Sequence, residues 1–128
     1  VCAWFGDRVK VVSVEPASIP AMFEARRAAR PVEVSVSGLA ADSLGAKVIG
    51  AVPFAVAAPF VDDAVLVSDD AIRAAQRELW ASVRLMAEPG GAAALAAVLS
   101  GAYRPAPAER VVVVVCGSNV DPTTVVTP

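Results

Sequence analysis

Five consecutive valines that end in a small polar turn constrain this chain more than any other feature. Residues Val111–Asp121 read VVVVVCGSNVD, and such a β-branched run predicts a buried strand that stops at the turn. In an open parallel sheet, ligands bind beyond the carboxyl ends of the strands. The turn would therefore present a thiol, a hydroxyl, an amide and free backbone N–H groups where a site forms. The alternative is a core strand followed by an ordinary turn, and this segment alone does not decide between them.

Composition bounds the class of protein. The chain has 128 residues, enough for one domain with an apolar core. Hydrophobic residues make up 56% and charged residues 19%, which indicates that some apolar surface faces a partner. The net charge of -2 argues against a nucleic-acid or anionic-membrane surface. The longest low-charge stretch, Val48–Val61, contains two prolines and is too short to span a bilayer, so we expect a cytoplasmic protein.

The inventory of reactive side chains excludes several mechanisms. The chain has no histidine, which rules out Ser-His-Asp and Cys-His catalysis and most zinc sites. Its two cysteines, Cys2 and Cys116, lie near opposite ends of the sequence. That spacing fits no metal site, and reduced thiols in a cytosolic protein are the simplest interpretation.

Strand and helix patterns along the chain predict the α/β class. We expect the run VCAWF before Gly6 to be the last turn of a buried helix, the end of an element that begins upstream of this sequence. Residues 1–128 should form a single α/β unit with a three-layer open, mainly parallel sheet flanked by helices. The predicted strands are Arg8–Glu15, Val32–Val36, Asp62–Ser68 and Val111–Val115, and the predicted helices are Ala21–Ala29, Asp69–Met86 and Gly91–Ser100.

Several stretches together carry a family resemblance. They are VVSVEP at Val11–Pro16, AADSLGAKVIG at Ala40–Gly50, VSDDAIRAAQRELW at Val67–Trp80, EPGGAAALAAVLSG at Glu88–Gly101 and VVVVVCGSNVDP at Val111–Pro122. In this order and spacing the chain resembles the C-terminal part of the fold-type II pyridoxal-phosphate enzymes, specifically the serine/threonine dehydratases (threonine ammonia-lyases). The resemblance implies pyridoxal 5'-phosphate as the cofactor.

The resemblance also implies what this sequence does not contain. In that family the Schiff-base lysine and a glycine-rich phosphate loop belong to an N-terminal portion, which is absent here. The only lysines, Lys10 and Lys47, read as surface residues. We therefore expect no catalytic residue in this chain, and the isolated chain should be inactive.

The residues that the resemblance assigns to the cofactor lie in two loops. Cys116 would stand opposite the pyridine nitrogen as a neutral partner, which suits β-elimination better than a carboxylate would. Gly117, Ser118 and Asn119 would shape the turn beneath the ring. Glu88, which also reads as a helix cap, would lie beside the ring, and Gly90 and Gly91 would let the backbone approach the cofactor closely.

A structural cation is a weaker possibility. Some members of the family bind one through a glutamate at the position of Glu15 and an acidic residue six positions on, where this chain has Ala21. A hard cation needs several oxygen ligands, so we expect no metal and keep Glu15 only as a weak candidate. Asp42, followed by Ser43 where the family pattern has glycine, would order its loop.

The function implied is the cofactor-ring side of an enzyme that converts L-threonine or L-serine to a 2-oxo acid and ammonia. We expect a small amino-acid substrate, the missing N-terminal segment as a partner, a homodimer when intact, and a short degradative type of enzyme. Two alternatives stay open. The chain could be a non-catalytic half that pairs with a separate N-terminal chain, or a stand-alone α/β binding module.

Overall fold

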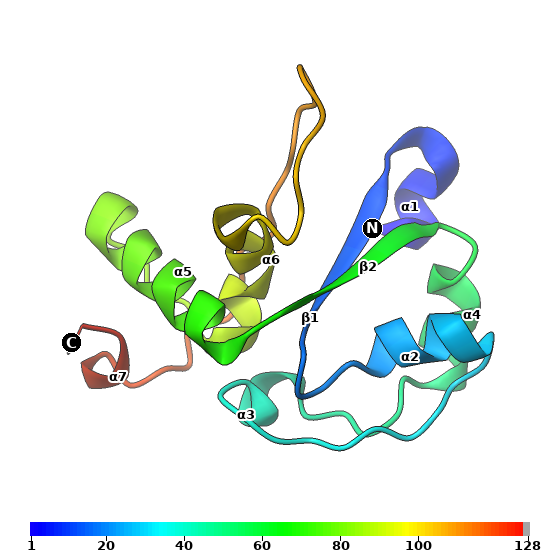
Figure 1. Ribbon diagram of the computed structural model, residues 1–128, viewed down its shortest axis with the longest axis horizontal. Helices are drawn as coiled ribbons and strands as arrows, with labels where there is room; N and C mark the ends of the chain where they lie inside the picture. Colours follow the sequence, from blue (N-terminus) through cyan, green and yellow to red (C-terminus); the bar gives the residue numbers. More distant parts are fainter. Residues whose placement is uncertain (127–128) are drawn as a thin grey trace.

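The computed structural model describes residues 1–126 and has the predicted α/β architecture. Two strands form its parallel sheet, and the segment between them carries three helices (Figure 1). In chain order the elements are α1 Cys2–Phe5, the 3-10 turn η1 Gly6–Arg8, β1 Val11–Pro16, α2 Ala21–Ala28, α3 Ala41–Leu44, α4 Ala51–Ala57, β2 Val61–Val67, α5 Asp69–Val83, α6 Pro89–Ser100 and α7 Thr123–Val126.

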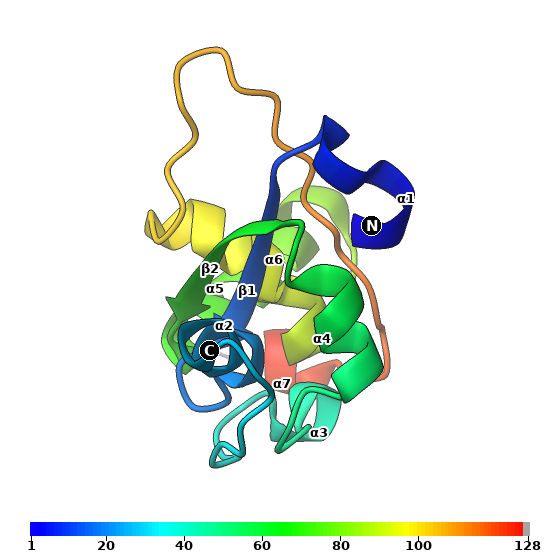
Figure 2. The ribbon, with the colours of Figure 1, turned by 90° about the vertical axis from the view of Figure 1, so that its right-hand side faces the viewer.

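Helices cover both faces of the sheet. β1 and β2 run parallel, with Val14 opposite Val65 and Glu15 opposite Leu66. Helix α6 packs on one face and is backed by α5, whereas α2 packs on the other face. Figures 1 and 2 show this order from two directions, with α5 and α6 on one side and α2 and α4 on the other. The predicted layers of helix, parallel sheet and helix are therefore present.

Helix α5 begins at the predicted residue and ends earlier than predicted. The hydroxyl of its N-cap, Ser68, accepts a hydrogen bond from the backbone N–H of Ala71 at 3.2 Å. Arg84 adopts a left-handed conformation, and its guanidinium donates to the carbonyls of Trp80 and Ala81. That cap stops the helix at Val83, before the predicted end at Met86, because a left-handed residue cannot continue the helix.

Helix α6 begins two residues before the predicted Gly91. Pro89 occupies its first position, where the missing N–H costs nothing, and Gly101 closes it with φ 76°. Small buried residues let α6 lie closely between α5 and the sheet. The main hydrophobic cluster consists of Val67, Ile72, Ala75, Leu79, Ala87, Ala92, Ala93, Ala96 and Ala97.

Two predicted strands are wrong. Val32–Val36 and Val111–Val115 form no strand, although Arg8–Glu15 and Asp62–Ser68 correspond closely to β1 and β2. Within residues 1–126, no backbone group of Arg110–Cys116 takes part in a hydrogen bond. A strand requires a neighbouring strand, and β propensity within one segment cannot supply it.

Two short helices that the sequence reading missed lie between β1 and β2. Helix α3 falls in the stretch interpreted as a small-residue loop, and α4 falls in the stretch interpreted as interrupted by prolines. Pro53 lies in the first turn of α4, where a helix tolerates proline. The predicted N-terminal helix end is present as α1, closed by Gly6 at φ 57°, but it is not buried, because Trp4 is 77% exposed.

Candidate functional site

Two of the predicted loops meet at the start of α6. The backbone N–H of Glu88 donates to the carbonyl oxygen of Gly117 at 2.8 Å. This bond joins the loop before α6 to the turn after the valine segment, although the two are distant in the sequence. The structure thereby brings Glu88 together with the Cys116–Gly117 turn.

Glycines make this close approach possible. A Cβ atom at Gly91 would collide with the backbone carbonyl of Cys116, and one at Gly117 would collide with the carboxylate of Glu88. Gly117 also has φ 68°, a conformation that favours glycine. Both positions therefore require a residue without a side chain, and the backbone at this corner is bare enough to lie against a flat ring.

A third loop reaches the same corner through Ser43. The backbone N–H of Gly90 donates to the Ser43 hydroxyl at 2.9 Å, and Ser43 lies in α3, whose residues pack against α6. Sequence reasoning noted Ser43 only as a replacement for glycine and assigned it no contact. The signal was the hydroxyl itself, since glycine could not have supplied an acceptor there. Its neighbour Asp42 is exposed.

The other polar side chains of the turn face outward. Cys116, Ser118 and Asn119 are exposed, and within residues 1–126 none of their side chains makes a hydrogen bond. The turn continues into α7, where Asp121 accepts from the backbone N–H of Thr123 at 2.9 Å. That bond and one from the Thr123 hydroxyl lower the pKa of Asp121. The thiol of Cys116 is thus available to a ligand beside the glycine corner.

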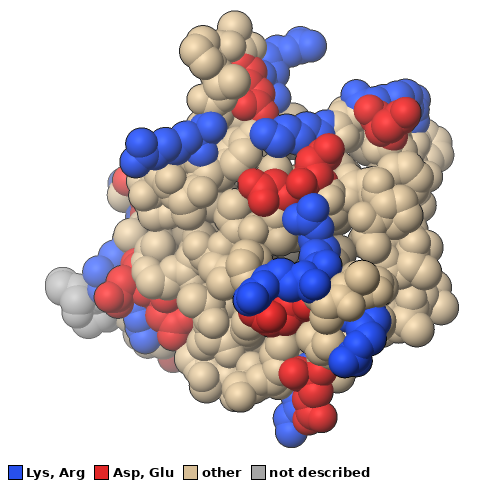
Figure 3. Space-filling model, turned by 45° about the vertical axis from the view of Figure 1, so that its right-hand side comes forward, with Lys and Arg blue, Asp and Glu red and all other residues tan. Residues whose placement is uncertain are grey.

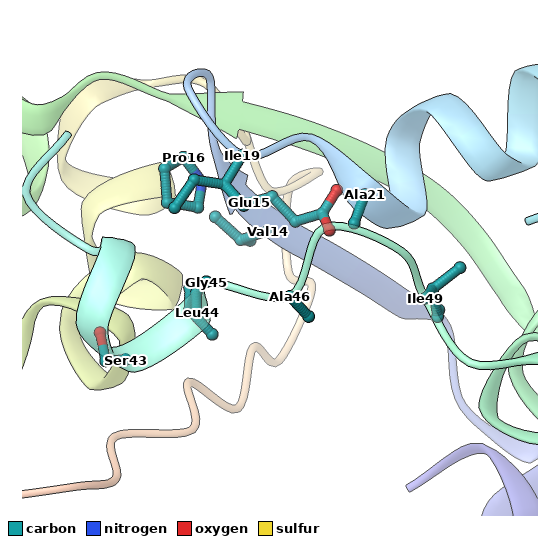
Figure 4. A pocket seen from close by; sticks show the side chains of 10 residues that line it. All are labelled: Val14, Glu15, Pro16, Ile19, Ala21, Ser43, Leu44, Gly45, Ala46 and Ile49. Atoms are coloured by element: carbon teal, nitrogen blue, oxygen red, sulfur yellow. The ribbon is translucent and has the colours of Figure 1, made fainter. Parts of the chain in front are cut away.

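Glu15 lines an open cavity of about 450 Å³ between the carboxyl end of β1 and α3 (Figure 4). Its two carboxylate oxygens accept the backbone N–H groups of Met22 and Phe23 at 2.7 and 2.9 Å. Burial raises the pKa of Glu15 above its ordinary value, against the lowering effect of those two bonds. The carboxylate therefore acts as a remote cap for α2, whose own N-cap is Pro20.

The metal candidate gains no partner from the fold. No group of three or more His, Cys, Asp or Glu side chains within residues 1–126 is arranged to hold a metal ion. Figure 4 shows the Glu15 oxygens directed towards Ala21 at the start of α2. The position where the family pattern has a second acid therefore presents only a methyl group.

The two lysines lie in different places. Lys10 precedes β1, and its ammonium donates to the Tyr103 hydroxyl at 3.3 Å. That hydrogen bond raises the pKa of Lys10 above its ordinary value, which keeps the amine protonated and poorly nucleophilic. A strand of six residues spans about 20 Å, so Lys10 and the Pro16 end of β1 are far apart. Lys47 is exposed in the segment after α3.

The surface carries mixed charge. Figure 3 shows basic and acidic side chains interspersed over the face that it presents, with uncharged surface between them. This face therefore lacks the uniformly basic patch that nucleic-acid binding requires. Within residues 1–126, no helix combines the length and the apolar character needed to cross a bilayer.

Comparison with known proteins identifies relatives of most of the chain. Residues 3–117 match the family described as pyridoxal-phosphate dependent enzyme. The biosynthetic L-threonine dehydratase of Salmonella typhimurium is 36% identical over 115 residues, which cover 89% of this chain and 22% of that enzyme. The phenylserine dehydratase of Ralstonia pickettii is also 36% identical over 115 residues, or 90% of this chain and 35% of that enzyme.

Solved structures agree with these matches. A bacterial threonine deaminase, from the organism abbreviated T.th., superposes with a TM-score of 0.72 at 28% identity, covering 81% of this chain and 38% of that one. The processed threonine deaminase isoform 2 of Solanum lycopersicum gives a TM-score of 0.81 at 25% identity, covering 95% of this chain and 34% of that one. The chain thus spans only about a fifth to two fifths of the length of these four relatives.

Proposed function

Because the chain belongs to the family of pyridoxal-phosphate dependent enzymes, we propose that it contributes the cofactor-ring side of a serine/threonine dehydratase. The complete enzyme would convert L-threonine or L-serine to a 2-oxo acid and ammonia by β-elimination. The family and its cofactor are shown by the match over residues 3–117. The reaction and its substrates are inferred from relatives named as threonine dehydratases and a phenylserine dehydratase.

The observation that carries the proposal is the contact between the Glu88–Gly91 loop and the Cys116–Gly117 turn. Two glycines there leave no room for a side chain, and an exposed neutral thiol lies next to them. A flat aromatic ring needs bare backbone on one side and a polar group at its edge. The residues present therefore fit one side of the cofactor ring.

Each residue of this corner has a proposed role. Pyridoxal phosphate supplies an electron sink when bound. Cys116 would contact the ring nitrogen without giving it a full negative charge, and Glu88 would lie beside the ring. Gly90, Gly91 and Gly117 would set the backbone, while Ser118 and Asn119 would close the turn beneath it. None of these residues replaces the lysine that holds the cofactor, so we infer that the isolated chain is inactive.

A second portion of the enzyme is required by this proposal, and one surface favours it. Val112 is 88% exposed and Val114 is 56% exposed, in an extended segment whose backbone makes no hydrogen bond within residues 1–126. Unpaired backbone and apolar side chains on one extended segment are the features with which a sheet edge accepts another strand. We propose that the lysine-bearing portion of the same enzyme pairs there.

The decisive experiment compares two preparations with pyridoxal phosphate and either L-threonine or L-serine. The printed chain alone should release no 2-oxo acid, and the chain combined with the lysine-bearing portion of the same enzyme should release it. Turnover by the chain alone would overturn the division of roles. Failure of the combined protein with both substrates would overturn the dehydratase assignment.

The exposed valine segment also favours the alternative of a non-catalytic half that pairs with a separate chain. Titration with pyridoxal phosphate separates the readings, because a half that has lost the chemistry, or a module for another ligand, should not bind it in the combined protein. A homodimeric intact enzyme, a cytoplasmic location and a degradative role stay predictions. The relative from Salmonella typhimurium is described as biosynthetic.

A further inference from the structure

Helix α6 begins without a cap from its own sequence. Its N-cap residue, Glu88, makes no side-chain hydrogen bond to the helix, and the next residue, Pro89, has no backbone N–H. The first N–H that needs an acceptor therefore belongs to Gly90. An uncapped donor at a helix start is normally satisfied by a nearby Ser, Thr, Asp or Asn side chain.

Ser43 supplies that acceptor from a different helix. Its hydroxyl oxygen lies 2.9 Å from the backbone nitrogen of Gly90. The hydroxyl donates in turn to the carbonyl of Ala40 at 3.4 Å, and Ala40 is fully buried. The acceptor is therefore anchored in the fold and not carried on a free surface side chain.

The fit around Gly90 is close. A Cβ atom at Gly90 would lie 2.8 Å from the Ser43 hydroxyl and 2.8 Å from Cγ of Leu44. Helix α3 thus holds the first turn of α6 on one side. On the other side, Glu88 donates to Gly117 and Gly91 touches the carbonyl of Cys116. The loop from Glu88 to Gly91 is clamped between two segments, and only the α3 side depends on a side-chain hydroxyl.

We propose that Ser43 is a positioning residue for the cofactor corner. Its hydroxyl holds the Gly90 N–H and thereby sets the distance of Glu88 and Gly91 from the Cys116–Gly117 turn. The hydrogen bond belongs to this chain alone, whereas its effect on the cofactor rests on the proposed function. Ser43 would not touch the reacting atoms and would act only through the loop.

The first test needs no cofactor. Hydrogen exchange of the Gly90 amide, followed by NMR in the full chain, is compared between the unchanged protein, Ser43→Ala and Ser43→Thr. Ser43→Ala should exchange about fivefold faster, the equivalent of one ordinary hydrogen bond, and Ser43→Thr should stay close to the unchanged protein. Ser35→Ala, at an exposed serine, is the matched control. Equal exchange in Ser43→Ala and the unchanged protein would overturn the proposal.

The second test uses the chain combined with the lysine-bearing portion. The dissociation constant of pyridoxal phosphate and the position of its absorption band are measured for the same variants. Ser43→Ala should weaken binding about fivefold, again the equivalent of one ordinary hydrogen bond, and shift the band, and Ser43→Thr should restore both. Absence of binding by the unchanged protein would overturn the proposed function and this role with it. Binding and a band that Ser43→Ala leaves unchanged would overturn the role of Ser43 alone.

Discussion

The backbone N–H of Glu88 and the carbonyl oxygen of Gly117 lie 2.8 Å apart and hold two loops in register. This bond puts the start of α6 against the turn that follows the valine segment. Because Gly117 cannot carry a side chain without striking Glu88, the pairing depends on backbone shape as much as on the hydrogen bond. The candidate site is thus defined by main-chain contacts that surround a few side chains.

Replacing Gly91 with alanine should disrupt this corner. The new methyl group would meet the backbone carbonyl of Cys116, which cannot move aside as a flexible side chain can. We expect at least about 1–3 kcal/mol of lost stability, the usual cost of overpacking, and loss of cofactor binding by the combined protein. Urea unfolding and cofactor titration measure the two effects. Leu99→Ala, at an exposed position of the same helix, should change neither by as much, and equal effects would contradict the prediction.

Cys116 should tolerate serine and reject aspartate. Serine keeps a small neutral group, whereas aspartate adds a charge-assisted contact worth about 1.5–3 kcal/mol, which corresponds to about a 10- to 100-fold change in rate. We expect Cys116→Asp to slow 2-oxo acid release by the combined enzyme by that factor. Because Cys116 is exposed, the urea midpoint should stay unchanged in both variants. Equal rates for the two variants would remove the proposed role of the thiol.

Glu15 should make stability depend on pH. Its folded-state pKa is raised above the ordinary value of 4.5, so the folded protein holds the proton more tightly than the unfolded chain. The stability gained from this proton is fully present below pH 4.5 and is lost as the pH rises through the folded-state pKa. The free energy of unfolding of the unchanged chain, minus that of Glu15→Gln, should therefore fall as the pH rises from 4.5 towards neutrality.

Urea titrations at a series of pH values would measure this difference, with Glu33→Gln as the control at an exposed carboxylate. A difference that rose with pH would mean that the two N–H bonds from Met22 and Phe23 outweigh burial. In that case the assigned direction for Glu15 would be wrong.

Ser68→Ala should destabilise α5. The Ser68 hydroxyl accepts the N–H of Ala71, and removal of such a cap costs about 1 kcal/mol. The urea midpoint should fall accordingly, while Ser68→Asp should retain the cap. Loss of stability in the aspartate variant equal to that in the alanine variant would show that the cap is not the cause.

Val112→Lys should weaken association without unfolding the chain. Val112 is 88% exposed, so the lysine adds charge to an edge without opening a cavity in the core. Binding of the lysine-bearing portion, measured by sedimentation, should weaken by roughly tenfold, equal to about 1.4 kcal/mol. Val83→Lys, on the exposed side of α5, is the matched control. Unchanged association in Val112→Lys would place the partner elsewhere.

The elements that the sequence predicted well carry their own local signals. Helix α5 has an N-cap serine and an apolar stripe at helical spacing, and α6 has a proline at its start and a glycine at its end. β1 and β2 are β-branched runs bounded by turn residues. Each signal acts within a few neighbouring residues, so it can be read without knowledge of the rest of the fold.

The candidate site was predicted only in part. The resemblance named Glu88, Gly91 and Cys116, and the structure brings the loops that carry them together, yet their roles stay predictions. Ser43 was overlooked because its partner, Gly90, lies far away in the sequence. The strand expected at Val111–Val115 was wrong for a related reason, since its hydrogen bonds would have to come from another segment.

Local chemistry in the sequence alone therefore determined the α/β class, the ends of the main helices and the family. The tertiary structure decided which backbone groups meet: Glu88 with Gly117, Gly90 with Ser43, and the Glu15 carboxylate with the first turn of α2. Caps and apolar stripes depend on neighbours along the chain, whereas these contacts depend on how separate segments pack. Burial and hydrogen-bond geometry are properties of that packing, and no single segment contains them.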